Sequence, residues 1–223
     1  MRRPEETQRI VRKKLHEQIY EILKQDILEH RIVFGEKITN RGLRERYGVS
    51  STPVRDAINR LYLEGLLDEI SQGGARVIPF DYKRAMDVNE LMFILNKEAI
   101  AMSAERADGE EVVSCLQTAL DRQSENLLSD LYYQYDQQFH HVFFEFCGNS
   151  QITQFYTQHN SLWMLLLRFY HAAQDNSRTI AVSQHAEIVA AYKRGDIALV
   201  QSLMKEHFDA AVDHLKTNIP ERP

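Results

Sequence analysis

The spacing of apolar side chains predicts three helices in the first third of the chain. Apolar residues recur at steps of three and four over residues 10–30, which is typical of a helix with one buried side. A short helix is predicted from Asn40, as its N-cap, to Tyr47. A third begins among the hydroxyl side chains of residues 50–52, which can cap backbone N–H groups, and ends at Gly65. Two short helices joined by a glycine-containing turn are the sequence form of a helix-turn-helix, although a helical hairpin inside an all-α core has the same pattern.

The pattern changes after the third helix, where two short apolar segments flank the pair Gly73–Gly74. Residues 66–70 and 75–79 are too short for helices, and a Gly-Gly turn between such segments is typical of a β-hairpin. The segment 34–39 reads as a turn. Three helices followed by a hairpin predict a winged helix-turn-helix domain in residues 1–79.

Residues 82–215 show helical periodicity and no strand signal. Asp108, Ser129 and Asp196 are the predicted N-caps of three of the helices. Six antiparallel helices joined by short loops make a bundle, whose interior is where ligands and metals are normally held. The predicted fold class is therefore mostly α, a winged helix-turn-helix followed by an all-α six-helix bundle in residues 80–223. The predicted helices span residues 82–106, 110–128, 130–147, 150–174, 178–194 and 196–216.

Composition and charge narrow the class of protein. The sequence holds no apolar run of about 18 residues and no signal-peptide pattern, so we expect a cytoplasmic protein with no membrane partner. Cys115 and Cys147 are isolated, which argues against a disulfide framework and a thiolate zinc site. Residues 1–78 hold 15 basic and 12 acidic side chains, against 12 and 20 in the remainder. A mildly basic first third on an acidic body favours a sequence-reading module over a protein that coats nucleic acid.

Four side chains of metal-ligand type fall on the apolar sides of three predicted helices. Asp136 and His140 lie four residues apart and stack on one helical face, which also carries Phe143. His185 and His207 lie on the apolar faces of the last two helices. Neutral imidazoles and a carboxylate suit a divalent transition metal such as Zn²⁺, Ni²⁺ or Mn²⁺. A lone inward histidine is more often a hydrogen-bonded core residue, and spacing alone leaves that interpretation open.

The run from Tyr47 to Ala57 reads YGVSSTPVRDA, and the segments EGL and GARV follow it. In these segments the first third of the chain resembles the GntR family of bacterial transcription regulators. The helical remainder is similar to the effector domain of the FadR subfamily. The resemblance implies that Arg41 and Arg55 read bases, whereas Ser51 stands where the family has another DNA-contacting arginine. The predicted DNA-contacting residues are Arg41, Ser50, Ser51, Thr52, Arg55, Arg60, Gly73 and Gly74.

The same resemblance implies a metal and an effector. Metal-binding members of the family carry Asp-x-x-x-His, a later His-x-x-Ile and a histidine in the last helix, and the four residues named above match this pattern. Family members commonly bind small carboxylates, sugar acids or fatty acyl derivatives, often at the metal. Many use an arginine four residues before a glutamate on the first effector-domain helix; the glutamate is Glu98, but the arginine position is Ile94. Arg168 is the predicted replacement, and an arginine that extends to the bundle surface is the alternative.

These observations predict a DNA-binding transcription regulator that is not an enzyme. The sequence holds no P-loop, no HExxH and no paired Glu-x-x-His motif. We expect a homodimer on an inverted-repeat operator, because one helix-turn-helix reads one half-site. We further expect a small-molecule effector, bound at the metal, to modulate DNA binding. The alternatives are a regulator with a purely structural metal and a metal-dependent hydrolase with its active site in the bundle.

Overall fold

The computed structural model describes residues 14–79, 81–172 and 176–213. The chain falls into two compact units, residues 1–78 and residues 79–223, which we call the N-terminal unit and the C-terminal unit. Across these described ranges, no helix combines the length and the apolar character needed to cross a membrane.

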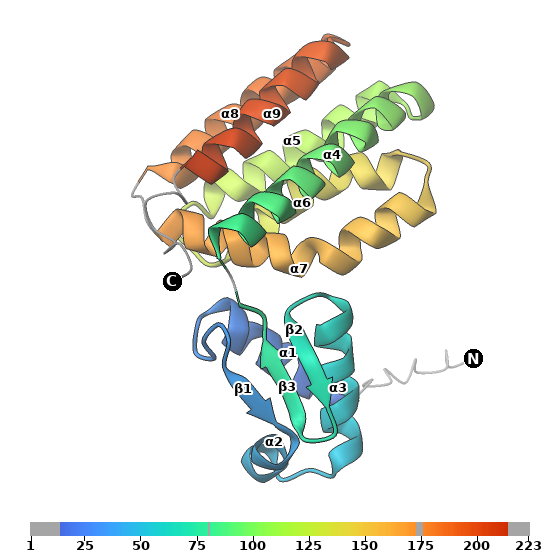
Figure 1. Ribbon diagram of the computed structural model, residues 1–223. Helices are drawn as coiled ribbons and strands as arrows, with labels where there is room; N and C mark the ends of the chain where they lie inside the picture. Colours follow the sequence, from blue (N-terminus) through green and yellow to red (C-terminus); the bar gives the residue numbers. More distant parts are fainter. Residues whose placement is uncertain (1–13, 80, 173–175, 214–223) are drawn as a thin grey trace, which may run out of the picture. The chain divides into compact units, whose positions relative to one another are not determined.

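The N-terminal unit is a winged helix-turn-helix, as the sequence predicts (Figure 1). Its three strands form an antiparallel sheet with the third strand in the middle. Leu23 and Ile27 from the first helix and Val54 and Leu61 from the third are fully buried and supply the apolar core. The elements in chain order are α1 (Leu15–Leu28), β1 (Lys37–Thr39), α2 (Asn40–Tyr47), α3 (Ser51–Leu63), β2 (Leu67–Ser71) and β3 (Gly74–Val77).

Strand β1 was not predicted, because the segment 34–39 reads as a turn in the sequence. The strand is only three residues long, too short for an alternating pattern, and it forms through pairing of Lys37 with Arg76 and Thr39 with Gly74 on β3. Gly74 has a φ of +145°, and a Cβ built there would lie 1.9 Å from the carbonyl oxygen of Ile38. The approach of β1 to β3 therefore requires glycine at this position.

The cap of α2 also differs from the prediction. Thr39, and not Asn40, is the N-cap, and its side-chain oxygen accepts a hydrogen bond from the Gly42 N–H at 3.0 Å. Asn40 binds the hairpin turn, since its Nδ2 donates to the Gln72 carbonyl at 2.8 Å and its backbone N–H donates to the Gly73 carbonyl at 2.9 Å. The predicted start of the next helix is confirmed in position, with Ser50 at the N-cap of α3, but the Ser50 side chain makes no capping hydrogen bond there.

The C-terminal unit is a bundle of six helices, as predicted (Figure 1). Large aromatic side chains such as Trp163, Phe139 and Phe208 fill its interior. Asp108 and Asp196 each accept a hydrogen bond from a backbone N–H in the first turn of a helix, whereas Asp130 takes the N-cap position predicted for Ser129. The helices are α4 (Tyr82–Arg106), α5 (Gly109–Glu125), α6 (Leu131–Phe146), α7 (Ser150–Ala172), α8 (Ser177–Lys193) and α9 (Ile197–Asp213).

Candidate functional site

Three histidines from three helices meet inside the C-terminal unit. His140 lies on α6, His185 on α8 and His207 on α9, and all three are buried. One ring nitrogen from each lies within 4.8 Å of the corresponding nitrogen of the other two. The ring centroids are 5.1 Å apart for His140 and His185, 5.3 Å for His140 and His207, and 4.6 Å for His185 and His207. The structure thus brings together three of the four side chains that the sequence analysis singled out.

Aromatic packing holds two of these imidazole rings in place. The ring of His185 stacks on Phe139 with centroids 3.9 Å apart, and the ring of His140 meets Trp163 edge-on at 4.6 Å. Phe139 and His140 are neighbours on α6, so one turn of that helix supplies both a ligand-type side chain and a wall for the next. Restricted rings of this kind can present a nitrogen in a fixed direction.

Each imidazole is hydrogen-bonded through Nδ1 to a carboxamide oxygen. His140 Nδ1 lies 3.1 Å from Asn96 Oδ1, His185 Nδ1 lies 2.8 Å from Gln123 Oε1, and His207 Nδ1 lies 2.9 Å from Gln184 Oε1. Because a carbonyl oxygen only accepts, each Nδ1 carries the proton and donates it. The lone pair of each ring is then on Nε2, the atom available to a metal. We call Asn96, Gln123 and Gln184 the amide shell.

Second contacts fix the orientation of two amides in this shell. Asn96 Nδ2 donates to the Met92 carbonyl at 2.8 Å, and Gln123 Nε2 donates to Asp136 Oδ1 at 2.7 Å. In both residues the nitrogen is therefore engaged elsewhere and the oxygen faces the histidine. The sequence analysis did not identify the amide shell. A single Asn or Gln on a predicted helix carries no sign that its side chain is buried beside a histidine.

Asp136 lies one turn before His140 on α6 and shares its buried face. Its Oδ1 accepts the Gln123 hydrogen bond, while its Oδ2 is buried and has no hydrogen-bond partner among the residues that the structure describes. Burial raises the pKa of Asp136 to about 7, although the Gln123 bond acts to lower it. The carboxyl lies outside the group of three mutually close imidazole nitrogens. A buried carboxylate oxygen of this kind requires a positive partner or a proton.

The electrostatics of the histidines suit metal binding as well. Burial lowers the pKa of His207 to about 4, and burial together with the nearby His207 lowers the pKa of His140. Both rings are therefore neutral near pH 7, the form that coordinates a metal. Three buried imidazoles and one carboxyl group fit a divalent transition metal. Nε2 of His140 and Oδ2 of Asp136 lack hydrogen-bond partners among the described residues.

Helix α7 adds further buried polar atoms to the interior of the C-terminal unit. Tyr156 Oη, Asn160 Oδ1 and Trp163 Nε1 are buried without a hydrogen-bond partner in the part of the chain that the structure describes. Burial raises the pKa of Tyr156, and the Asp136 carboxylate raises it further. Arg168 is half-buried, with its guanidinium carbon 4.8 Å from the centroid of the Tyr133 ring.

Most of the predicted DNA-contacting residues lie on exposed parts of the N-terminal unit. In Figure 1, α2, the beginning of α3 and the turn between β2 and β3 lie at one end of this unit. The Arg41 side chain is 87% exposed and pairs with Glu45 at 2.8 Å, and Arg55 is exposed on α3. The other exposed or half-buried members of the predicted set at this end are Ser50, Ser51, Thr52 and Gly73.

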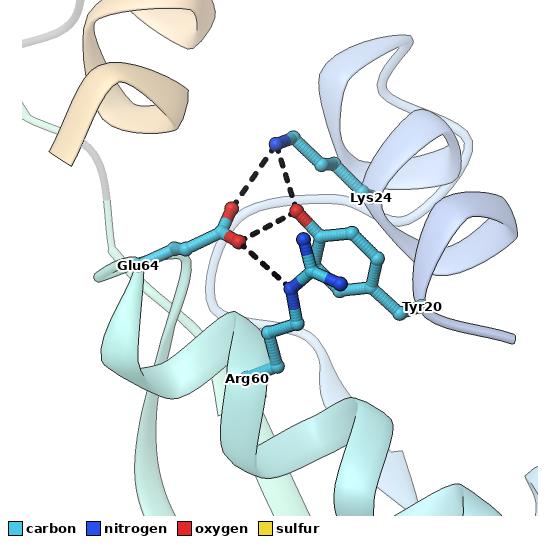
Figure 2. Close-up of polar contacts among 4 residues, drawn as sticks. All are labelled: Tyr20, Lys24, Arg60 and Glu64. Atoms are coloured by element: carbon cyan, nitrogen blue, oxygen red, sulfur yellow. Dashed lines mark hydrogen bonds and ion pairs between the residues drawn. The ribbon is translucent and has the colours of Figure 1, made fainter. Parts of the chain in front are cut away.

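Two members of the predicted set lie elsewhere. Gly74 is buried, and the close approach of β1 described above explains why this position is a glycine. Arg60 lies near the opposite end of α3, where its guanidinium carbon is 3.7 Å from the centroid of the Tyr20 ring and its Nε is 3.5 Å from Glu64 Oε1 (Figure 2). Its side chain is 52% exposed but is turned toward α1.

Known protein families match the sequence of both units. Residues 15–77 match the family described as bacterial regulatory proteins, gntR family, and residues 87–210 match the FCD domain. The chain is 26% identical over 192 residues to the Nta operon transcriptional regulator of Aminobacter aminovorans, covering 84% of this chain and 90% of that protein. It is 23% identical to the uncharacterized HTH-type transcriptional regulator YdhC of Bacillus subtilis, over 92% of each chain. The solved structure of E. coli McbR/YncC has the same fold, with a TM-score of 0.73 at 18% identity over 92% of this chain and 99% of that one.

Proposed function

This chain belongs to the GntR family of bacterial regulatory proteins, with an FCD domain in its C-terminal unit, and from that premise we propose how the two units divide the work of regulation. It is a DNA-binding transcription regulator and not an enzyme. We assign residues 1–79 to operator binding in the bacterial cytoplasm and residues 80–223 to effector binding and dimerisation. The effector alters operator binding by acting on a metal centre in the bundle.

The proposed metal centre consists of Asp136, His140, His185 and His207. The observation that carries the proposal is the convergence of three buried imidazoles whose Nδ1 atoms are all occupied by amide oxygens. A divalent Zn²⁺, Ni²⁺ or Mn²⁺ ion held there would offer remaining coordination positions to an oxygen-rich ligand. The amide shell keeps the imidazoles in the correct tautomer, and Gln123 holds Asp136 and His185 at the same time.

The proposed effector is a small carboxylate that lies between the metal centre and α7. Tyr156 and Trp163 supply hydrogen-bond donors on that side, and Arg168 supplies a positive charge. Charge-assisted hydrogen bonds of this kind favour an anion over a neutral ligand. Because the ligating side chains come from α6, α8 and α9, a ligand at the centre changes how these three helices pack.

The proposed DNA-binding surface combines α2, the first turns of α3 and the hairpin turn. Arg41 and Arg55 read base edges, while Ser50, Ser51, Thr52 and Gly73 lie close to the backbone of the duplex. Two such surfaces are needed for an inverted repeat, so we propose a homodimer. The exposed apolar side chains Leu91 and Ile94, three residues apart on α4, support pairing through the C-terminal unit.

Metal content tests the proposal directly. Protein purified without chelator should carry about one divalent metal per chain, and His185→Ala should lose it. His141→Ala is the matched control, because His141 follows His140 on α6 but is partly exposed and pairs with Glu145. Chelator-free protein that holds no stoichiometric metal, and that Zn²⁺, Ni²⁺ and Mn²⁺ all fail to stabilise, would reduce the four residues to a buried polar network.

A purely structural metal is the second candidate, since four protein ligands can complete a tetrahedral site. It predicts that metal-loaded protein binds operator equally well with and without any small carboxylate. The effector proposal predicts a change in operator affinity that Arg168→Gln weakens while metal content stays at the wild-type level. A carboxylate panel with no effect on operator affinity would favour the structural metal.

A further inference from the structure

A network of charged and polar side chains ties the last turn of α3 to α1, and Figure 2 shows its four members. The Tyr20 hydroxyl donates to Glu64 Oε1 at 2.6 Å. Lys24 Nζ lies 2.9 Å from the Tyr20 hydroxyl oxygen and 3.1 Å from Glu64 Oε2. Arg60 completes the network with its Nε near Glu64 and its guanidinium over the Tyr20 ring. We call these four residues the α1–α3 anchor.

The α1–α3 anchor is organised around one buried carboxylate. Glu64 is only 8% exposed, so its charge must be balanced from within the unit. Lys24 and Arg60 bring positive charge to it, and burial together with the Glu64 bond raises the pKa of Tyr20, which keeps the hydroxyl protonated as a donor. Arg60 is thereby held on the side of α3 that faces α1.

The α1–α3 anchor lies at the far end of α3 from the residues proposed to read DNA. Arg55 precedes Glu64 by nine residues, which is about 13 Å along a helix axis. A tilt of about 4° around the anchored end displaces the turn that carries Arg55 by about 1 Å, enough to break a hydrogen bond to a base. The α1–α3 anchor fixes the last turn of α3, and the orientation of that turn determines where Arg55 lies relative to a base edge.

A second buried carboxylate, Asp26 on α1, contacts α2, the other helix of the helix-turn-helix. Asp26 is buried, and its Oδ2 lies 3.0 Å from Arg46 Nη2 on α2 while its Oδ1 accepts a hydrogen bond from Arg31 Nε at 2.7 Å. Both helices of the helix-turn-helix are thus attached to α1 by charged contacts. This arrangement makes α1 the frame against which the reading helices are oriented.

We infer that Arg60 is a positioning residue and not a DNA contact: it fixes the last turn of α3 on α1 and thereby aims Arg55. The inference rests on the proposed function in one respect, that α3 is the DNA-reading helix. It gives Tyr20 and Glu64 the same role. It also requires the planar guanidinium itself, because a lysine ammonium does not reproduce the combined contact with the Tyr20 ring and Glu64.

The test compares Arg60→Met with Arg60→Lys in the full chain. Binding is measured on a duplex that the wild-type protein selects from a random-sequence library, and on the same duplex changed at the base pair where Arg55→Ala loses discrimination. The measurements cover a salt series at a temperature where circular dichroism shows each variant folded. We expect both variants to lose discrimination between the duplexes by about tenfold, with an unchanged slope of log K against log salt. Tyr20→Phe, which removes only the hydroxyl, should give a smaller loss in the same direction and carries the test if Arg60→Met does not fold.

Two results would overturn the inference. If Arg60 contacts a phosphate, Arg60→Met lowers affinity for both duplexes alike and flattens the salt slope by about 0.9, and Arg60→Lys restores both. If the α1–α3 anchor serves stability alone, the variants melt at a lower temperature but discriminate as the wild type does. A wild-type protein that selects no duplex contradicts the proposed function instead, so the two failures are distinguishable.

Discussion

The two units each bury a polar cluster, and the two clusters differ in how their charges are satisfied. In the α1–α3 anchor, the Glu64 carboxylate is matched by Tyr20, Lys24 and Arg60, all from the same unit. In the histidine cluster, Nδ1 of each imidazole is hydrogen-bonded to an amide oxygen. Other buried atoms of the cluster, such as Asp136 Oδ2, have no hydrogen-bond partner among the described residues. Both clusters are built from side chains of separate helices, so burial alone does not distinguish them.

The difference indicates which cluster is structural and which takes a ligand. A cluster whose donors and acceptors match one another needs nothing from outside and holds helices in place. A cluster in which hydrogen bonds at Nδ1 orient the Nε2 atoms of the imidazoles is arranged to bind a ligand such as a metal ion. We therefore expect the histidine cluster, and not the α1–α3 anchor, to respond to metal.

Metal addition should produce the largest effect. At a free metal concentration about a thousandfold above Kd, binding stabilises the C-terminal unit by about 4 kcal/mol, which corresponds to roughly 10 °C in unfolding temperature. Differential scanning calorimetry measures the shift, and hydrogen exchange locates it. Slower exchange in α6, α8 and α9 with no change in the N-terminal unit is the expected pattern. Equal protection of both units would remove the distinction between the clusters.

Loss of one amide should weaken metal binding without removing a ligand. Gln123→Leu deletes the hydrogen bonds to both Asp136 and His185, and second contacts of this kind are worth about 10–100-fold in metal affinity. Competition with a chelator of known affinity measures the change. Gln117→Leu is the matched control, because Gln117 lies on the same helix but is exposed and bonded to Asp121. Equal affinities for the two variants would show that Gln123 does not orient the site.

Loss of the Glu64 carboxylate should destabilise the N-terminal unit by about 2 kcal/mol, a typical value for charge-assisted hydrogen bonds. Urea denaturation of Glu64→Ala measures the free energy of unfolding, and the loss should be the same with and without metal. Glu45→Ala provides the comparison, because its pair with Arg41 is exposed and should contribute under about 1 kcal/mol. A metal-dependent loss in Glu64→Ala would show that the two clusters are coupled.

Proton release should give the smallest signal and the finest test of the metal centre. The pKa of Asp136 is raised to about 7, so the metal-free protein holds a proton there at pH 6. Metal binding should therefore release about 0.9 proton per chain at pH 6 and almost none at pH 8. His207 contributes little at either pH, because its pKa of about 4 leaves it neutral. Calorimetric titration in buffers of different ionisation enthalpy counts the protons. Asp136→Asn should abolish the release at pH 6, and release that persists in this variant would assign the proton to another group.

The same raised pKa has a consequence for stability in the absence of metal. The folded state holds the Asp136 proton between the carboxyl's ordinary pKa of 3.8 and about 7, where the unfolded chain has lost it. The contribution of Asp136 to stability is therefore full below pH 3.8, falls as pH rises from there, and is gone above about pH 7.

The sequence revealed the residues whose spacing carries a pattern. His140, four residues after Asp136, could be placed on one helical face, and the hydroxyl residues before Arg55 marked the start of α3. The amide shell could not be found this way, because Asn96, Gln123 and Gln184 come from three helices and become a set only through the fold.

Arg60 shows a different limit of sequence reasoning. Periodicity correctly placed it outside the buried stripe of α3, and an exposed arginine on a helix predicted to read DNA suggests a DNA contact. Its actual neighbours, Tyr20 and Glu64, lie on α1 and at the end of α3, and the contact with Tyr20 spans 40 positions in the sequence. Strand β1 was missed for a related reason, since three residues become a strand only when β3 is beside them.

Gly74 has a consequence for how relatives of this protein should be compared. Any side chain there would collide with the Ile38 carbonyl, so the position accepts only glycine whatever sequence the regulator recognises. A glycine shared by two relatives at this hairpin position could be mistaken for a mark of shared DNA specificity. At this position it records the spacing of two strands, and regulators with unrelated operators should retain it equally.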